Sequence, residues 1–228
     1  MTQKSIQTII CAKCGKTYEK ELIDSLDITN DKEALEFLIS GNIFKETCPH
    51  CNKSFYNDRP LSCIDLNKKF MVQYAPYPEI FKAVLESIES DDNKMEDGFI
   101  FRIVIDGMRK FIEKVGLLSY GLNDIVAEVY KEILYINLRD DRIEDMLYQF
   151  DYECTNTKIM IMKEDSCEYY DIDIEMFNSL VEDVSDRGVI GRNNDYVVNR
   201  DLAMKILYNR GDLKPIHLDI LEDLEAEA

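Results

Sequence analysis

Four cysteines fall in two pairs of identical spacing: Cys11 with Cys14, and Cys48 with Cys51. A C-x2-C pair lets two thiolates from one tight turn reach the same ion, and a second pair completes a tetrahedral set of four sulfur ligands. Gly15 follows the first pair, where a residue that tolerates positive φ relieves the turn. The pattern predicts one structural Zn²⁺ held by these four cysteines.

Two other interpretations of the cysteines stay open. One C-x2-C pair that opens a helix is typical of a redox centre, although two matched pairs exceed that need. An iron–sulfur centre is the other alternative. Four thiolates leave no open coordination position, so we expect the ion to hold structure rather than to activate water. Because such sites bind zinc with roughly 10–16 kcal/mol in small peptides, we expect Cys48→Ser to lose the metal and to unfold residues 1–78.

Side chains for nucleophilic catalysis are scarce in this chain. Its two histidines are His50, inside the second cysteine turn, and His217, near the end. The chain therefore offers few candidates for a nucleophilic Cys–His pair. Three cysteines lie outside the pairs and are expected to be reduced thiols, with Cys63 a small buried side chain of a strand: Cys63, Cys154 and Cys167.

Carboxylates are abundant, and two groups of them could bind Mg²⁺. The first comprises Glu168, Asp171, Asp173 and Glu175, which could share one face of a strand. The second lies at Asp140–Asp145, which we expect at the start of a helix. Solvated surface is the simpler interpretation of both groups. An enzyme or small-molecule binder that uses acids near 168–175 remains an alternative function, and it requires those acids to converge in one cleft with raised pKa values.

The net charge of −18 is unevenly distributed. Residues 1–78 hold ten basic and ten acidic side chains, so the remaining 17 basic and 35 acidic groups of residues 79–228 account for all of it. A field of that sign repels phosphate backbones, so we do not expect nucleic-acid binding. Nucleic-acid binding would require five lysines of residues 1–78 to lie on one face of the module: Lys13, Lys16, Lys53, Lys68 and Lys69. The acidity instead favours a protein partner with a basic surface.

The sequence contains no apolar run of 18 residues and no pattern of a signal peptide at its start. Seven cysteines are an odd number, and four have metal spacing rather than disulfide spacing. We therefore expect a cytoplasmic protein without a membrane-spanning segment.

The spacing of apolar residues along the chain predicts short strands on both sides of the cysteine pairs. We expect strands at 5–10, 18–28 and 42–47, and a helix over 31–39 that Asn30 and Asp31 cap and Gly41 ends. A hairpin follows over 61–75, and Pro78 opens a helix.

The rest of the chain mixes helices and strands. We expect a strand at 99–105, a helix from Met108, a helix capped by Asn123, a hairpin over 147–162, a strand at 169–172, and helices around 174–184 and 200–209. The fold class is α+β: a zinc-ribbon-like small β domain with an inserted helix (1–78), a helical connector and linker (79–98), and an acidic α+β domain (99–228).

Residues 5–76 resemble the CpXC domain, a family named for paired Cys-Pro-x-Cys motifs. The resemblance rests on the second pair with Pro49, on the segment 21–28 with the short helix after it, on 38–42, and on the close of the hairpin at 72–76. Further stretches at 102–104, 111–114 and 121–124 look like the segment that often follows this domain, which extends the resemblance to roughly residue 135.

The sequence departs from the family pattern at two positions. Ala12 stands where proline is usual, and Asn52 stands where glycine commonly follows the second pair, so Asn52 is expected to adopt left-handed geometry. Neither position supplies a ligand. The resemblance implies the fold and the zinc and supplies no chemistry. We therefore expect a non-catalytic zinc protein that acts as a protein-interaction or adaptor module.

Overall fold

The computed structural model describes residues 1–89, 98–150, 157–186 and 196–208. Within them the chain is α+β, as the sequence predicts. The first half contains β1 (Gln3–Ile10), β2 (Thr17–Asp27), α1 (Lys32–Ile39), the 3-10 turn η1 (Asn42–Phe44), β3 (Lys45–Thr47), β4 (Ser54–Tyr56), β5 (Leu61–Asp65), β6 (Phe70–Tyr74) and α2 (Pro78–Glu89). The second half contains β7 (Ile100–Val104), α3 (Met108–Ser119), α4 (Asp124–Leu138), β8 (Ile143–Phe150), β9 (Thr157–Lys163), β10 (Ser166–Asp171), α5 (Ile174–Asp186) and α6 (Arg200–Tyr208).

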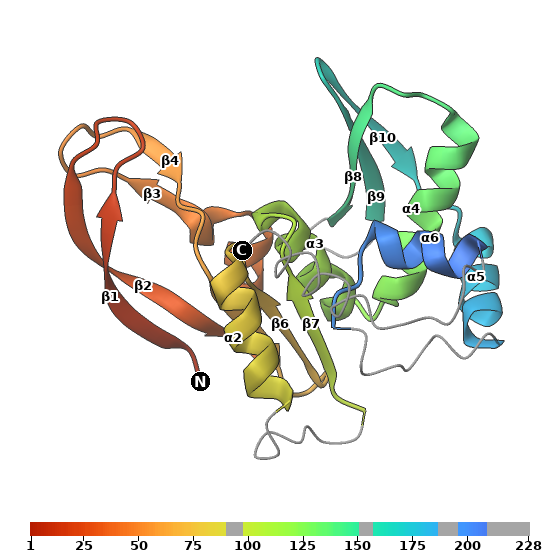
Figure 1. The fold of residues 1–228 in the computed structure, drawn as a ribbon, viewed down its shortest axis with the longest axis horizontal. Helices are drawn as coiled ribbons and strands as arrows, with labels where there is room; N and C mark the ends of the chain where they lie inside the picture. Colours follow the sequence, from red (N-terminus) through yellow and green to blue (C-terminus); the bar gives the residue numbers. More distant parts are fainter. Residues whose placement is uncertain (90–97, 151–156, 187–195, 209–228) are drawn as a thin grey trace.

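Three sheets organise the described residues. A five-stranded sheet has the order β1-β2-β5-β6-β7, a three-stranded antiparallel sheet has the order β10-β9-β8, and β3 pairs with β4 alone. Figure 1 shows β1 and β2 reaching away from the body as a long arm, with β3 and β4 beside its tip and the second sheet at the other end of the molecule. Only the last residues of β2, Ser25–Asp27, pair with β5. Most of the arm is therefore a two-stranded ribbon.

Local sequence explains where several elements begin and end. Asp31 caps α1 by accepting a hydrogen bond from the backbone N–H of Ala34, and Gly41 ends the segment at a φ of 72°. Asn123 caps α4 by accepting from the N–H groups of Ile125 and Val126. These predicted caps are confirmed.

Two predicted elements differ from the structure. The strand expected over 42–47 is a 3-10 turn up to Phe44 and a strand only from Lys45, since Gly41 turns the chain before it can extend. The acids of Asp140–Asp145 do not start a helix. They lie in the turn before β8 and in its first residues, where Asp140 pairs with Arg142 and Lys163. Residues 90–97 of the expected linker, Cys154 and His217 lie outside the described residues.

The main sheet continues past the expected boundary at 79–98. β7 pairs in parallel with β6, from Phe70 opposite Ile100 to Tyr74 opposite Val104. One buried cluster joins Leu26, Phe44 and Val72 with Phe111 and Val115 of α3. A second cluster joins α2 and β7 with α4, α6 and the β8–β10 sheet. The division of the chain into 1–78, 79–98 and 99–228 remains a prediction, but strands on both sides of it share one sheet.

Candidate metal centre and a buried charge network

The two cysteine pairs lie at the ends of two matching hairpins. Residues 11–16 connect β1 to β2, with Ile10 opposite Thr17, and residues 48–53 connect β3 to β4, with Thr47 opposite Ser54. In each turn the N–H of the first cysteine donates to the carbonyl of the lysine five residues later, at 2.9 Å for Cys11 and 3.1 Å for Cys48. The sequence therefore builds the same turn twice.

Left-handed residues close both turns. Gly15 has a φ of 70°, and Asn52, at the matching position, has a φ of 56°. Their N–H groups donate to the carbonyls of Cys11 and Cys48 at 2.8 and 2.9 Å. Asparagine tolerates this conformation better than most residues with a side chain, so the substitution of the usual glycine by Asn52 leaves the turn intact, as predicted.

The turns bring four sulfur atoms together. The Sγ atoms of Cys11, Cys14, Cys48 and Cys51 lie within 4.8 Å of one another, and among the described residues no other group of three or more potential metal ligands is this close. The Cys11–Cys51 and Cys14–Cys48 sulfur atoms are each 3.8 Å apart. A disulfide would need about 2.05 Å. The four cysteines could therefore hold a metal ion as thiols or thiolates.

Backbone N–H groups lie close to two sulfur atoms of this cluster. The N–H groups of Lys13 and His50 point at the sulfur atoms of Cys11 and Cys48, at 3.3 and 3.4 Å. Burial opposes ionisation of the Cys11 thiol, but the N–H groups of Lys13 and Cys14 and the neighbouring thiols outweigh it and lower the pKa of Cys11 to about 7. The N–H of Lys16 lowers the pKa of Cys14, but burial and the three neighbouring thiols outweigh it and raise that pKa to about 11. Metal ligation requires thiolates, which the surroundings therefore favour at Cys11 and disfavour at Cys14.

A small separate core surrounds the sulfur atoms. Ile9, Leu22 and Phe55 pack with Cys11 and Cys48 in a cluster distinct from the two larger ones. A bridge from Lys20 of β2 to the buried Glu46 of β3, at 2.7 Å, joins the two hairpins. Outside the sulfur cluster, the Nε2 of His50 lies 3.2 Å from the carbonyl of Thr17. The cysteines and this core thus hold the arm tip together.

The other predicted groups are dispersed. Lys13, Lys16 and Lys53 lie in the two cysteine turns, whereas Lys68 and Lys69 lie in the β5–β6 turn, beside Thr29 at the far end of β2. Since β2 has 11 residues, about 30 Å of strand separates the two groups. The condition for nucleic-acid binding by these five lysines is not met.

Three of the four acids near 168–175 are exposed, and the fourth, Glu168, is half-buried. Hydrogen bonds from Lys163 and Tyr170 lower the pKa of Glu168, where the alternative required a raised value. Asp173 caps α5 by accepting from the N–H of Met176, and the side chain of Asp171 is 85% exposed. Cys63 is fully buried, as predicted, and Cys167 is exposed.

A network of buried charges lies where sequence reasoning did not place one. Asp124 and Lys131 are 2% and 3% exposed, and Glu113 is 2% exposed. Lys131 donates to both oxygens of Glu113 at 3.1 Å and to Glu128 at 2.9 Å, and the N–H of Tyr148 donates to Glu113 at 2.7 Å. Ion pairs of this kind are costly to bury unless each charge finds partners.

Asp124 is the second centre of this network. Arg102 donates to its two oxygens at 2.8 and 3.2 Å, and Lys114 lies 3.2 Å away. Burial alone would raise the pKa of Asp124, but the two cations outweigh it and hold that pKa well below its usual value. In the same way Glu113 and Glu128 overcome burial and raise the pKa of Lys131. The shifts of Asp124 and Lys131 both favour the charged form of the side chain.

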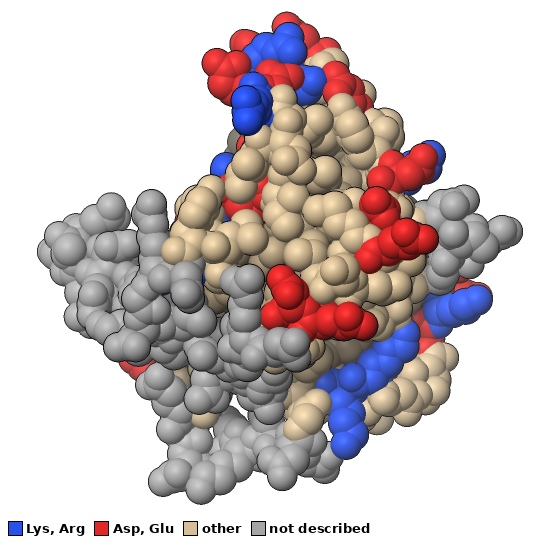
Figure 2. All heavy atoms as spheres, turned by 90° about the vertical axis from the view of Figure 1, so that its right-hand side faces the viewer, with Lys and Arg blue, Asp and Glu red and all other residues tan. Residues whose placement is uncertain are grey.

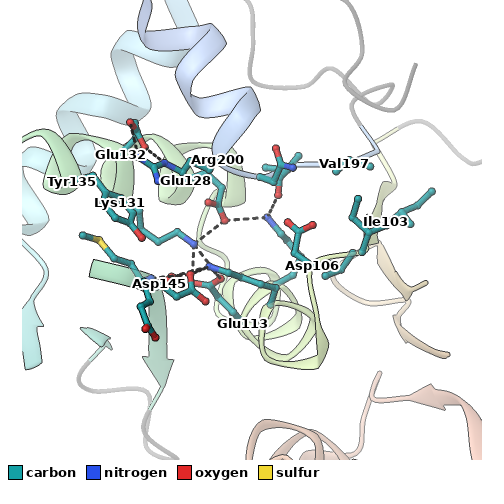
Figure 3. A pocket seen from close by; sticks show the side chains of 18 residues that line it. Ile103, Asp106, Glu113, Glu128, Lys131, Glu132, Tyr135, Asp145, Val197 and Arg200 are labelled. Atoms are coloured by element: carbon teal, nitrogen blue, oxygen red, sulfur yellow. Dashed lines mark hydrogen bonds and ion pairs between the residues drawn. The ribbon is translucent and has the colours of Figure 1, made fainter. Parts of the chain in front are cut away.

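The network surrounds a cavity of about 160 Å³. Its walls come from the end of β7, from α3, α4 and β8, and from residues 197–200 before and at the start of α6. Figure 3 shows Glu113, Glu128 and Lys131 on one side of the cavity and Asp106 across from them. The sequence signal was present in α3, where Glu113 and Lys114 stand between the apolar residues Ile112 and Val115.

The arm, its sulfur cluster and the adjoining sheet define a small β module that could hold a metal ion and is built into a larger α+β protein. A protein-family model described as CpXC protein matches residues 9–131, and the chain belongs to this family. No curated protein and no solved structure matches the chain. The matched span contains both cysteine pairs and also Arg102, Glu113, Asp124 and Lys131 of the charge network.

Proposed function

We propose that the four cysteines bind one structural Zn²⁺. The observation that carries this proposal is the spacing of the sulfur atoms. Zinc–sulfur bonds are about 2.3 Å long, and the edge of a tetrahedron with that radius is about 3.8 Å. The Cys11–Cys51 and Cys14–Cys48 distances are both 3.8 Å. Two of the six edges of the sulfur tetrahedron therefore have the length that a single tetrahedral ion needs, and the other four are at most 4.8 Å long.

A multi-iron cluster fits this spacing less well. Such a cluster inserts several iron atoms and inorganic sulfide between its cysteine ligands. Four protein sulfur atoms within 4.8 Å of one another leave room for one ion. With all four positions taken by protein ligands, the ion has no site for a substrate or water, and its role is to hold the two turns together.

We propose further that the metal-bound arm is a protein-contact module. β1 forms one edge of the five-stranded sheet, so in the described part of the chain its outer side faces no other strand. Ile6 and Ile10 on this strand are 74% and 67% exposed, and Tyr56 of β4 is 59% exposed. An open strand edge with apolar side chains is suited to pairing with a strand of a partner.

Charge supports a basic partner. The arm lies in the charge-balanced part of the chain, while the −18 comes from residues 79–228. Figure 2 shows acidic side chains in several separate groups on one face of the second half, beside a stripe of Lys and Arg. The net field, rather than one continuous acidic patch, would attract a basic partner.

Site-specific photo-crosslinking in the native host tests this proposal. A photo-reactive residue replaces Ile6 in the full chain, and in a matched control it replaces Tyr169, which is 60% exposed on β10 in the other sheet. We expect a defined protein cross-linked through position 6 and not through position 169, and we expect Cys48→Ser to abolish it. Equal labelling from both positions, or labelling that survives Cys48→Ser, would contradict the contact role of the arm.

A further inference from the structure

A groove of about 360 Å³ lies where the two halves of the chain meet. Its walls come from the end of α1, the start of α3, the middle of β8 and β9, and Tyr56 of β4. A Cβ atom built on Gly41 would lie 3.7 Å from Cδ1 of Ile112, so the chain after α1 lies directly against α3. Ligand pockets typically have volumes of about 300–1,000 Å³. The groove is therefore large enough for a small molecule.

The sheet formed by β8, β9 and β10 turns apolar side chains toward this groove. Successive side chains of a strand point to opposite faces of the sheet. Met146 and Tyr148 belong to the buried cluster that includes α4 and α6. Leu147 and Met160 pair opposite each other, belong to none of the three buried clusters and line the groove. This face of the sheet is thus separate from the cores.

Apolar side chains of the helices complete the lining. Ile39 is the last residue of α1, and Met108 and Ile112 lie four residues apart on one side of α3. All three are half-buried, as is Met160. Methionine side chains are flexible and adapt to apolar groups of different shapes. The groove can therefore enclose the hydrocarbon part of a ligand.

One positive charge of the groove has no acidic partner. Arg109 and Glu113 are the two charged residues of the lining. Glu113 is 2% exposed, and Lys131 and the N–H of Tyr148 already donate to its oxygens. Arg109 is exposed, and its Nη1 lies 3.4 Å from the sulfur of Met162. In the described part of the chain, no carboxylate forms an ion pair with Arg109.

The unpaired state of Arg109 is not caused by a shortage of acids. Residues 79–228 contain 35 acidic and 17 basic side chains, and Lys110 and Lys114 on the same helix each bind a carboxylate. The first turn of α3 contains no acidic residue, and Gly107 provides no side-chain cap, so the positive end of the helix dipole adds to the charge of Arg109. The groove thus combines apolar walls with an uncompensated positive group.

We propose that this groove binds a small carboxylic acid with an apolar body. The guanidinium of Arg109 presents paired N–H donors that match the two oxygens of a carboxylate. Gln149 also lines the groove, and no described residue accepts a hydrogen bond from its side-chain amide. The apolar body lies against Met108, Ile112 and Met160. This inference goes beyond the proposed function and depends neither on the cysteine centre nor on the contact role of the arm.

NMR titration of the full chain with four probes at constant ionic strength tests the proposal. Hexanoate has both the carboxylate and the apolar body, hexanol and hexylammonium have the same body without charge or with a positive charge, and acetate has the carboxylate alone. We expect hexanoate to give saturable shifts at the amides of Gly41, Arg109 and residues 147–149 and at the methyl groups of Met108 and Met160. Hexanol should bind about tenfold more weakly or less, hexylammonium more weakly than hexanol, and acetate without saturation.

Arg109→Gln separates the contribution of the charge from that of the apolar walls. The variant should bind hexanoate more weakly by about tenfold or more and should bind hexanol as the wild type does. The matched control is Arg139→Gln, which changes an exposed arginine after α4 that does not line the groove. This control should bind both probes as the wild type does.

Spectra of both variants must match the wild type away from the substituted residue, which shows that each is folded. Equal hexanoate binding by Arg109→Gln and Arg139→Gln would overturn the proposal. Tighter binding of hexylammonium than of hexanoate would overturn it as well, and so would the absence of any saturable shift with hexanoate.

Discussion

At the scale of single residues, Asn52 and Gly15 perform the same task in two separate turns. Both adopt left-handed φ values directly after a cysteine pair, and both close their turn onto the first cysteine. A left-handed conformation costs most residues with a side chain about 1–2 kcal/mol, and glycine almost nothing. The cost of this conformation for asparagine lies between the cost for glycine and the cost for other residues with a side chain.

Substitution of Asn52 should therefore change metal affinity in a predictable order. Asn52→Gly should bind zinc at least as tightly as the wild type, and Asn52→Val should bind it more weakly by about 1–2 kcal/mol because the β-branched side chain resists this φ. Competition with a chromogenic chelator measures the difference. Equal affinity of the glycine and valine variants would show that the turn does not govern the site.

The cysteines themselves have a matched control in the chain. Cys48→Ser removes a ligand whose side chain is fully buried among the other three, so the purified variant should contain no bound zinc. Cys167→Ser alters an exposed cysteine outside the cluster and should keep one zinc per chain. Elemental analysis of both proteins gives the result. Metal retained by Cys48→Ser would show that the four-sulfur assignment is wrong.

At the scale of the elements, α4 carries much of the charge network. Asp124, Glu128, Lys131 and Glu132 all lie on this helix, and Asn123 caps it through two N–H groups at 3.0 Å. Asn123→Ala should lower the free energy of unfolding by about 1 kcal/mol, as removal of a side-chain cap typically does. Asn123→Asp keeps the acceptor and should stay near the wild type in urea unfolding. An equal loss in both variants would contradict the capping role.

The Asp124 carboxylate makes the stability of the folded protein depend on pH. Since its folded pKa lies below the unfolded value of about 3.8, its contribution is fully present at neutral pH and is lost as the pH falls from about 4 through the folded pKa. Asp124→Asn should cost about 3–5 kcal/mol at pH 7, because Arg102 and Lys114 stay buried without their partner.

Urea unfolding between pH 7 and pH 2.5 tests this assignment. The loss of stability below pH 4 should be smaller in Asp124→Asn than in the wild type, because the variant has already lost that contribution. Asp171→Asn should keep the wild-type slope, since its side chain is 85% exposed. Parallel curves for wild type and Asp124→Asn would show that this carboxylate does not stabilise the fold through its charge.

The elements also show which features of the fold could be predicted from the sequence and which could not. The cysteine turns, the Asp31 and Asn123 caps and the 61–75 hairpin depend on neighbouring residues, and each was predictable from local pattern. The charge network was not, because Lys131 meets Glu113 and Asp124 meets Arg102 only after α3, α4 and β7 have packed. The membership of β7 in the first sheet escaped prediction for the same reason, since β6 and β7 pair across residues 75–99.

At the scale of the whole molecule, the cysteine centre and the main core are separate. Ile9, Leu22 and Phe55 surround the sulfur atoms, whereas α3 contributes to both of the larger clusters, with Phe111 in one and Leu117 in the other.

Among the described residues, no helix is long and apolar enough to span a membrane.

Metal removal should therefore have a local effect. Sequence alone led us to expect unfolding of residues 1–78, but β5 and β6 belong to the core that β7 and α3 share. A two-stranded ribbon is marginally stable by itself. Chelation should thus raise amide hydrogen exchange in β3, β4 and the outer part of β1 and β2, and leave β6, β7 and α3 protected. Global loss of protection would show that the centre stabilises the whole fold.

X-ray absorption at the metal edge of the purified protein tests the central claim most directly, because it reports the identity of the metal and its ligand atoms together. We predict one zinc per chain with four sulfur neighbours at about 2.3 Å and no nitrogen or oxygen in the first shell. Cys48→Ser should abolish the signal. Iron with iron neighbours, or zinc bound through nitrogen or oxygen, would contradict a closed Zn(Cys)4 centre at the tip of the arm.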